Sequence, residues 1–221
     1  MRMNRKCINE VRKDFCRCSN IKWIIGGSCS GKTTLCRALA KHANISLYDM
    51  DEHIFGDYMR RYTKEDYPAN SAWFSAENPL DWALSLSLED FDKFNKEANL
   101  EYLRLFSEDM IKQKDDSIVL VDGGIAYPEM LSKIIPVDNI ICLSISIEES
   151  EWIWETADSK KSMKSMISRL PEPEQKWKKF LECNKLITDT ILKEARDCGI
   201  EIIDRDNASV DRLKNFVISP F

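Results

Sequence analysis

The 221-residue sequence contains no apolar run that approaches the length of a membrane span, so we expect no transmembrane segment. Its N-terminus lacks the apolar stretch of a secretory signal, and Glu10 and Asp14 disfavour a transit peptide. Internal repeats and low-complexity linkers are missing as well. These absences argue against a membrane protein and a repeat architecture, and they predict a cytoplasmic protein.

An excess of positive charge is also missing. Acidic residues number 37 against 32 basic ones, so the net charge is −5 and neither nucleic acid nor an anionic membrane is an expected partner. Residues 1–20 hold six basic residues against two acidic ones, a net of +4, so the rest of the chain carries −9. We therefore interpret residues 1–20 as a basic N-terminal extension and residues 21–221 as a single domain.

Eight cysteines could suggest a disulfide framework, but the chain is long and 43% hydrophobic, enough to build a core without cross-links. Cys36 and Cys142 fall inside predicted helix and strand segments, so we expect reduced thiols. Cys7, Cys16 and Cys18 have no fourth ligand nearby, which makes them a poor zinc pattern. No resident zinc is predicted.

Short apolar runs rich in Ile and Val recur along the chain. Most do not alternate with polar residues, which is typical of strands buried on both faces of a parallel sheet. They cover residues 21–25, 45–48, 118–121, 140–147 and 200–203. Between them lie helical patterns, clearest at residues 91–106 and 177–195. This alternation predicts a doubly wound α/β sandwich whose ligands gather at the carboxyl ends of the strands.

Two connections are longer than a crossover needs. Residues 52–115 separate the second and third strands, and residues 148–199 separate the fourth and fifth. Insertions of this size often supply a substrate cap or a lid. We expect an acceptor-binding helical insertion at 52–115 and a lid within 148–176.

The stretch WIIGGSCSGKTTLCRAL, residues 23–39, contains the phosphate-loop pattern G-x-x-x-x-G-K-[ST]. An apolar strand leads into it and a helical pattern at 33–41 follows it. Backbone N–H groups of such a loop point at phosphate oxygens, and the helix adds its positive end. The predicted nucleotide-binding residues are Gly26, Gly27, Ser28, Cys29, Ser30, Gly31, Lys32, Thr33 and Thr34. A chance glycine-rich turn is the alternative.

Three of these residues have individual expectations. Lys32 is expected to reach the β- and γ-phosphates of ATP, and the Thr33 hydroxyl to ligate Mg²⁺. Cys29 lies at a helix N-terminus, where a thiol can acquire a lowered pKa, or it can simply fill a slot for a small residue. Oxidation sensitivity of the Cys29 thiol would distinguish these two roles.

The segment SIVLVDGG, residues 117–124, places an acid after an apolar strand. Asp122 is expected to hold Mg²⁺, directly or through water, and Gly123 and Gly124 leave room for a ligand at the strand end. The alternative is an ordinary strand that ends in an Asp-Gly turn. Together with the phosphate loop, the metal-binding interpretation is favoured.

A further acid pair follows the second strand, in LYDMDEH. Asp49 and Asp51 are two residues apart, so they point to the same side if the segment is extended. A carboxylate beside the phosphate loop can accept the proton of an attacking hydroxyl or hold metal-bound water. The alternative is that one of them caps a helix that runs through residues 54–55.

This combination of loop, acid pair and Asp-Gly-Gly turn resembles the small-molecule kinases of the P-loop superfamily. Its shikimate, gluconate and nucleoside or nucleotide kinase branches are the most similar. After residue 20 the chain also resembles bacterial ATP-binding proteins without a known substrate. The resemblance implies a five-stranded parallel sheet in the order 2-3-1-4-5, with a helical substrate region and a mobile lid. It further implies that Asp49 and Asp51 bind and activate the acceptor hydroxyl, and that Gly123 and Gly124 contact the acceptor.

The lid departs from the pattern of such kinases, which usually offer several arginines there. Residues 148–176 contain one arginine, Arg169, with Lys160, Lys161 and Lys164 nearby. Arg169 is the predicted catalytic residue that neutralises charge on the transferring phosphoryl group. A solvent-exposed salt bridge is the alternative for this side chain.

Three further residues are predicted to bind the acceptor. Arg60 and Arg61 could pair with an anionic acceptor, or they could belong to a solvated helix face. Trp73 sits in a loop-like segment bounded by prolines, where it could line an acceptor pocket or pack in the core.

The sequence therefore predicts a kinase that transfers the γ-phosphate of ATP, with Mg²⁺, to a hydroxyl or phosphate of a small molecule. The predicted catalytic residues are Lys32, Asp49, Asp51 and Arg169. The alternative is a nucleotide-dependent switch or binding protein without an acceptor. A guanine-specific switch needs Asn-Lys-x-Asp, but Asn184-Lys185 is followed by Leu186-Ile187 inside a helical pattern.

Overall fold

The computed structural model describes residues 20–112 and 117–218. The predicted basic extension, with Cys7, Cys16 and Cys18, therefore lies outside the described residues. So do the last residues of the 52–115 insertion. Within the described part of the chain, none of the helices combines the length and the apolar character needed to cross a membrane.

Five parallel strands form one sheet in the order β2-β3-β1-β4-β5. They are β1 (Ile21–Gly26), β2 (Ser46–Asp49), β3 (Val119–Asp122), β4 (Ile140–Ser144) and β5 (Glu201–Asp204). The predicted strands and their order are confirmed. The fourth strand was predicted to extend to residue 147, but β4 ends at Ser144. Ser146 is the N-cap of the next helix, and its hydroxyl accepts a hydrogen bond from the Glu149 N–H (3.1 Å).

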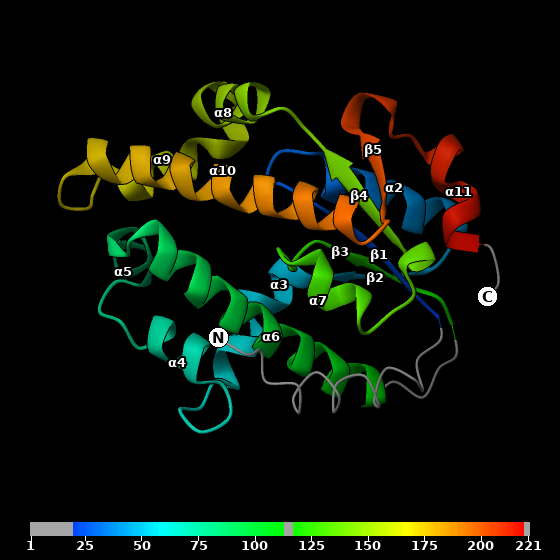
Figure 1. The fold of residues 1–221 in the computed structure, drawn as a ribbon, viewed down its shortest axis with the longest axis horizontal. Helices are drawn as coiled ribbons and strands as arrows, with labels where there is room; N and C mark the ends of the chain where they lie inside the picture. The colour runs from blue at the N-terminus through cyan, green and yellow to red at the C-terminus, as the bar shows by residue number, and fades with distance from the viewer. Residues whose placement is uncertain (1–19, 113–116, 219–221) are drawn as a thin grey trace.

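Helices cover both faces of the sheet, which makes a three-layer α/β/α sandwich (Figure 1). Helices α2 (Lys32–Ala43) and α11 (Val210–Ile218) pack on one face, around Ile24. Trp23 and Ile25 belong to the core on the other face, which α6 (Leu88–Lys112), α7 (Pro128–Ser132) and α10 (Pro173–Asp197) cover. Consecutive residues of β1 are thus buried on opposite faces, as a central parallel strand requires.

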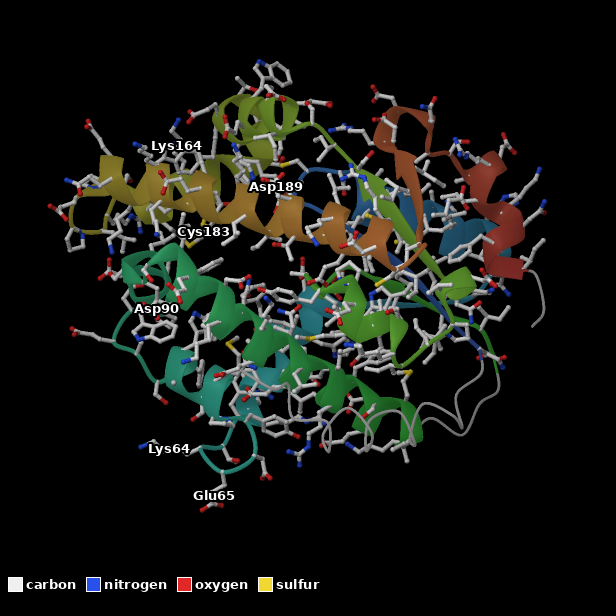
Figure 2. The ribbon with its side chains drawn as sticks, in the orientation of Figure 1. Lys64, Glu65, Asp90, Lys164, Cys183 and Asp189 are labelled. Carbon is white, nitrogen blue, oxygen red and sulfur yellow. The ribbon has the colours of Figure 1, made fainter. Side chains whose placement is uncertain are left out.

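The insertion between β2 and β3 is helical throughout much of its length. It contains α3 (Met50–Ile54), η1 (Asp57–Arg60), α4 (Pro68–Phe74), α5 (Pro79–Ser85) and α6. The expectation that Trp73 lies in a loop is wrong, because Pro68 occupies the first turn of α4 and favours the start of a helix. Lys64 and Glu65 stand at the tip of the loop before α4 and point away from the molecule (Figure 2).

The insertion between β4 and β5 packs around its own small apolar cluster. It contains α8 (Ile147–Thr156), η3 (Asp158–Lys160), α9 (Lys161–Ile167) and α10. Trp154 of α8 meets Phe180 of α10 edge to face, with ring centroids 4.7 Å apart, and Leu84 of α5 joins the same cluster. The predicted lid segment is therefore held against both α10 and the other insertion. The remaining short elements are η2 (Val137–Asn139) and η4 (Arg205–Asn207).

Candidate nucleotide and acceptor site

The phosphate loop joins the end of β1 to the start of α2, at the carboxyl edge of the sheet. Gly31 has φ of 83°, a left-handed conformation that lets α2 begin at Lys32. A Cβ at Gly27 would lie 2.5 Å from the Thr188 hydroxyl oxygen of α10, so a side chain has no room there. The loop is thus pressed between the sheet and α10.

Lys32 lies at the centre of the site. Its ammonium donates a hydrogen bond to the Gly27 carbonyl oxygen (2.8 Å), which folds the side chain back over the loop. Burial lowers the pKa of Lys32, while the nearby carboxylates of Asp122 and Asp51 partly offset that change. The Lys32 ammonium therefore interacts with the charges of two carboxylates, Asp122 at the end of β3 and Asp51 in α3.

Asp122 ends β3 and is almost completely buried, at 3% exposure. Within the described part of the chain its Oδ1 atom has no hydrogen-bond partner. Burial raises the pKa of Asp122, and a hydrogen bond with Thr33 and the charge of Lys32 act in the opposite direction. A buried carboxylate oxygen without a partner, beside a threonine hydroxyl, fits the oxygen ligands that Mg²⁺ prefers.

Asp49 and Asp51 occupy different positions from those expected of an extended pair. Helix α3 begins directly after Asp49, whose Oδ1 accepts hydrogen bonds from the N–H groups of Asp51 (3.1 Å) and Glu52 (3.3 Å). Asp49 is thus the helix N-cap, and its other oxygen lies 3.5 Å from Arg37. The assumption that the two acids share one side of an extended segment is wrong, and Asp51 stands in the first turn of α3.

A cavity of about 300 Å³ opens beside the phosphate loop. It is lined by Gly26, Ser28, Lys32, Asp51, Ile54, Phe55, Asn95, Asn99, Tyr102, Gly124, Ile125, Ala126, Ile187 and Ile191. Predicted residues of both the nucleotide side and the acceptor side therefore meet in one space. Burial and the neighbouring Asp49 charge raise the pKa of Asp51, while Lys32 and Lys160 act against that rise.

The glycine turn after β3 forms one wall of this cavity. Gly124 has φ of 74°, a backbone conformation that favours glycine. A Cβ there would also lie 2.3 Å from the Met50 Cβ, so a side chain at this position has no room. The Gly123 carbonyl oxygen accepts a hydrogen bond from the Trp23 indole (2.9 Å). Lys32 lies under the same turn, with its Cε 3.4 Å from the position of a Gly123 Cβ.

Four predicted acceptor residues are not among those that line the cavity. One is Gly123, although its neighbour Gly124 does line it. The others are Arg60, Arg61 and Trp73. Arg60 is exposed at the end of η1. Arg61 is held by Glu108 (2.8 Å) and Asp109 (2.7 Å) on α6. Trp73 packs edge to face on Phe55, with ring centroids 6.1 Å apart, so it supports a lining residue from behind.

The segment predicted to form a lid contains a lysine whose charge acts on the site. Lys160 in η3 lies over the Trp154 ring, 4.4 Å from its centroid. Burial raises the pKa of both Cys29 and Asp51, and the charge of Lys160 offsets part of that rise. Arg169 is exposed in the turn after α9 and does not line the cavity. Neither Arg169 nor Lys160 lines the cavity, and of the two only the charge of Lys160 acts on Asp51.

One residue that contacts the phosphate loop was not predicted, because it belongs to no recognisable sequence motif. Arg205, directly after β5, donates a hydrogen bond to the Cys29 carbonyl oxygen (2.9 Å) and pairs with Glu149 of α8 (3.2 Å). A single arginine after a strand has no periodicity or spacing that would mark it. Burial raises the pKa of the Cys29 thiol, which favours the slot-filling role over a reactive thiolate.

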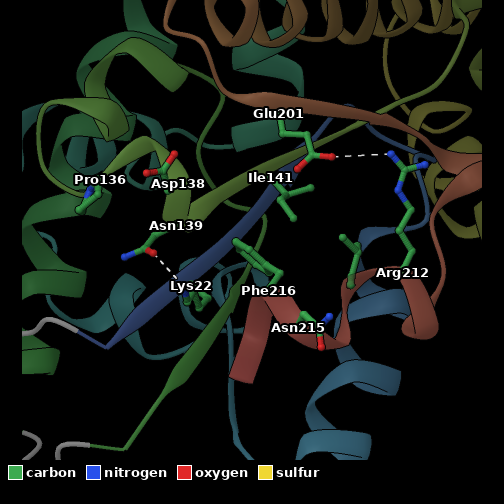
Figure 3. A pocket seen from close by; sticks show the side chains of 10 residues that line it. Lys22, Pro136, Asp138, Asn139, Ile141, Glu201, Arg212, Asn215 and Phe216 are labelled. Atoms are coloured by element: carbon green, nitrogen blue, oxygen red, sulfur yellow. Dashed lines mark hydrogen bonds and ion pairs between the residues drawn. The ribbon is translucent and has the colours of Figure 1, made fainter. Parts of the chain in front are cut away.

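A second cavity, of about 680 Å³, lies at the opposite edge of the sheet, where β1 and β5 begin (Figure 3). The Lys22 ammonium donates a hydrogen bond to the Asn139 side chain (2.8 Å) on one side of it. On the other side, Arg212 of α11 pairs with Glu201 (3.7 Å). Its residues belong to none of the predicted site motifs.

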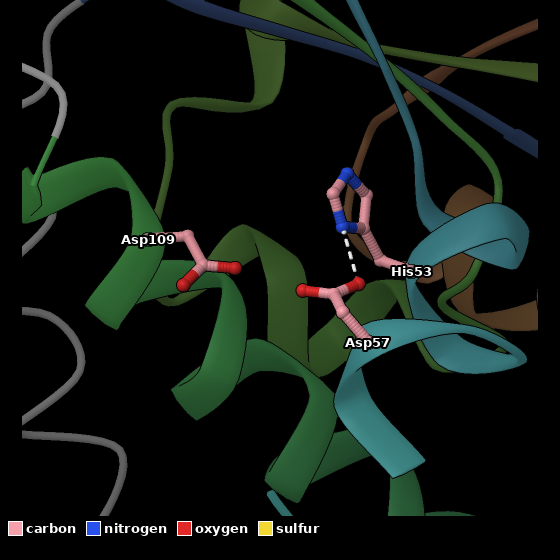
Figure 4. Close-up of side chains that lie close together, drawn as sticks. All are labelled: His53, Asp57 and Asp109. Carbon is pink, nitrogen blue, oxygen red and sulfur yellow. Dashed lines mark hydrogen bonds and ion pairs between the residues drawn. The ribbon is translucent and has the colours of Figure 1, made fainter. Parts of the chain in front are cut away.

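His53, Asp57 and Asp109 also lie close together (Figure 4). The His53 ring is within hydrogen-bond distance of Asp57 (2.9 Å). Asp109, however, already accepts hydrogen bonds from Arg61 (2.7 Å) and the Tyr48 hydroxyl (2.9 Å). With a guanidinium on one oxygen, Asp109 serves as an anchor between α6 and the β2 region rather than as a metal ligand.

A parallel sheet of this order, with a phosphate loop after its central strand, defines a nucleotide-binding protein of the P-loop class. The chain matches the family model AAA_17, an AAA domain, over residues 25–168. It belongs to this family of P-loop NTPase domains, which is typical of small-molecule kinases. No curated protein matches the sequence.

Proposed function

We propose that the protein is an ATP-dependent phosphotransferase that transfers the γ-phosphate of ATP to a hydroxyl or phosphate of a small molecule. The observation that carries this proposal is the shared cavity, in which Lys32 of the phosphate loop and Asp51 of the insertion line the same space. A protein that only hydrolyses or senses a nucleotide has no need of a cavity beside the γ-phosphate position. The family supports nucleotide binding, and the cavity supports a second substrate.

The donor side consists of the phosphate loop, Lys32, Thr33 and Asp122. Loop N–H groups and the N-terminus of α2 bind the phosphates, and the Lys32 ammonium moves from the Gly27 carbonyl to the phosphate oxygens. Thr33 and Asp122 would hold Mg²⁺, which neutralises phosphate charge when bound. Arg205 orients the loop through the Cys29 carbonyl and acts as a positioning residue.

The acceptor side is built around Asp51. For an alcohol acceptor, the hydroxyl oxygen attacks the γ-phosphorus and a new O–P bond forms. The bond to the β–γ bridging oxygen breaks, and its electron pair leaves with ADP. Asp51 takes the proton of the hydroxyl, a role that its raised pKa assists. Catalysis then depends mainly on positioning and on charge stabilisation.

The lid supplies positive charge. Among the lysines of the predicted lid segment, Lys160 is the one whose charge acts on both Cys29 of the phosphate loop and Asp51 of the cavity, as Lys32 also does. We therefore assign it the charge-neutralising role ahead of Arg169, which is exposed after α9. The predicted role of Arg169 requires a movement of the lid that brings this side chain to the cavity.

The alternative, a nucleotide-dependent switch or binding protein, has less support. Asn184 and Lys185 lie inside α10, so they do not form a guanine-reading loop. The decisive assay measures ATP consumption with and without a panel of small-molecule acceptors. Strong stimulation by an acceptor supports the kinase. Slow turnover that no acceptor changes, together with nucleotide-dependent binding of a protein partner, would contradict it.

A further inference from the structure

Part of the cavity beside the phosphate loop is lined by apolar side chains, which form its apolar wall. Six of its lining residues are apolar: Ile54, Phe55, Ile125, Ala126, Ile187 and Ile191. Three segments contribute them: α3 with its C-terminal residue Phe55, the turn after β3, and α10. At about 300 Å³ the cavity is at the lower end of the range for small-molecule sites.

Phe55 is the most exposed of these residues. It follows α3 with 60% of its surface accessible, although it lines the cavity and touches Trp73. A large aromatic side chain at the mouth of a cavity gains free energy when a ligand covers it. An acceptor with apolar surface would supply that cover, whereas a fully polar one would not.

The polar groups of the cavity are few, and most are uncharged. Asn99 is already engaged, since it accepts a hydrogen bond from the Ala126 N–H (2.6 Å) and donates one to the Asn95 carbonyl oxygen (2.8 Å). It fixes the turn after β3 against α6. Asn95 and Tyr102 line the cavity on the same helix, so neutral hydrogen-bonding groups face the acceptor there.

The positive charge that lines the cavity comes from the phosphate loop, which is the proposed ATP site. Among the described residues that line it, Lys32 is the one cation, and its place in the phosphate loop commits it to ATP. Arg61 is paired with two carboxylates of α6, and Lys160 stands on the lid over Trp154. An acceptor phosphate or carboxylate would thus be placed close to Asp51 and the triphosphate without a guanidinium of its own.

Such a placement is unfavourable. An anion there would lie next to the carboxylate of Asp51 and the triphosphate, and repulsion between these like charges raises its free energy where no cation is paired with it. An uncharged alcohol avoids the repulsion, and it gives Asp51 a proton to accept. We propose that the acceptor is an uncharged, partly apolar molecule that presents a hydroxyl to Asp51, not a phosphorylated or carboxylated compound. This inference rests on the proposed phosphotransferase function and narrows it.

The test uses the full chain with MgATP and acceptors in matched pairs. Each pair contains a neutral alcohol and an anionic counterpart: nucleosides against their 5′-monophosphates, panthenol against pantothenate, and hexoses against hexonic acids. ADP formation and the phosphorylated product are both measured. We expect a neutral acceptor to give a kcat/KM at least tenfold above its anionic counterpart.

The outcomes separate the two proposals. Efficient phosphorylation of anionic members only would overturn the neutral-acceptor inference and leave the phosphotransferase function standing. No stimulation by any member, with ATP binding intact, would count against both. The Lys32→Ala variant must lose product formation in every positive case, which excludes a contaminating kinase.

Two variants test the wall directly. Phe55→Ala should raise the KM of a neutral acceptor about tenfold and leave the KM of ATP unchanged. The control is Phe74→Ala, which removes an exposed aromatic side chain outside the cavity and should change neither KM. Asn95→Arg adds a guanidinium to the wall and should shift the preference towards anionic members. An unchanged acceptor KM in Phe55→Ala, or a loss of neutral activity without any shift in Asn95→Arg, would contradict the inference.

Discussion

The Arg205 guanidinium donates a hydrogen bond of 2.9 Å to the Cys29 carbonyl oxygen, which ties the end of the fifth strand to the phosphate loop. The same guanidinium pairs with Glu149 of α8 at 3.2 Å, so it joins three segments that are far apart in the chain. Cys29 has φ of 67°, an unusual conformation for a residue other than glycine. Arg205 therefore holds the loop in the curled form that phosphate binding needs.

Removal of this tie should weaken nucleotide binding more than chemistry. Arg205→Ala is expected to raise the KM of ATP about tenfold, equivalent to about 1.4 kcal/mol, with a smaller effect on kcat. Steady-state kinetics measures both quantities. Arg212→Ala, which breaks an ion pair with Glu201 at the other end of β5, is the matched control and should change neither. Equal effects of the two variants would contradict a specific role for Arg205.

Lys32→Ala should lower phosphoryl transfer by about 10²–10³-fold, since it removes a preorganised cation from the transferring phosphate. The fold should survive, because burial already lowers the pKa of Lys32 and its ammonium gains little from the interior. Thermal unfolding checks the fold and a coupled ADP assay checks the transfer. Lys41→Ala, at an exposed position near the end of α2, is the control. Unaltered turnover in Lys32→Ala would place the active site elsewhere.

Asp51→Asn should reduce kcat by a factor of about 10²–10⁴, the usual worth of a general base, while ATP affinity changes little. The pKa of Asp51 is raised, so its carboxylate forms at a higher pH than an ordinary aspartate. The rate of the native protein should therefore fall as pH drops through that raised pKa, and this acidic limb should vanish in Asp51→Asn. A collapse of ATP affinity with unaltered chemistry would make Asp51 a metal-site or structural residue.

Asp122→Asn should stabilise the protein when Mg²⁺ is absent. Because burial raises the pKa of Asp122, ionisation costs stability: the cost is absent below the ordinary aspartate pKa of about 3.9 and develops as pH rises through the raised value. The melting temperature at pH 7.5 should increase by roughly 2–4 °C per kcal/mol relieved, and the gain should disappear near pH 4.

The same variant should lose the stabilisation that MgATP gives to the native protein, as measured by thermal unfolding with and without the ligand. Asp211→Asn is the control, since this carboxylate is 91% exposed and should produce neither effect. A gain in stability that persists at low pH would show that ionisation of Asp122 is not its cause.

Much of the fold was predictable because its strands are short, apolar and bounded by polar residues. The loop from Gly26 to Thr33 and the acid at Asp122 follow two of these strands, so their common edge could be inferred. Asp49 and Asp51 were harder to place. Whether a segment after a strand stays extended or turns into a helix depends on local hydrogen bonds. Here the Asp49 side chain accepts hydrogen bonds from the first N–H groups of α3 and stabilises the helix.

The roles of individual arginines and aromatics were less predictable from the sequence. Arg61 binds Glu108 and Asp109 almost fifty residues away. Trp73 packs on Phe55 and does not itself line the cavity. Lys160 and Arg169 differ by nine positions, yet the packing of Trp154 brings Lys160 to the loop side. Long-range contacts of this kind leave no periodicity in the sequence.

The sequence by itself determined the class of the protein, because a phosphate loop and buried parallel strands are local patterns with a specific physical cause. Only the tertiary structure determined the cavity beside the phosphate loop. Its walls come from α3, α6, α10 and the turn after β3, which meet only when both insertions pack over the sheet. That packing places Lys32, Asp51 and an apolar wall around one space, and the proposed neutral acceptor rests on this arrangement.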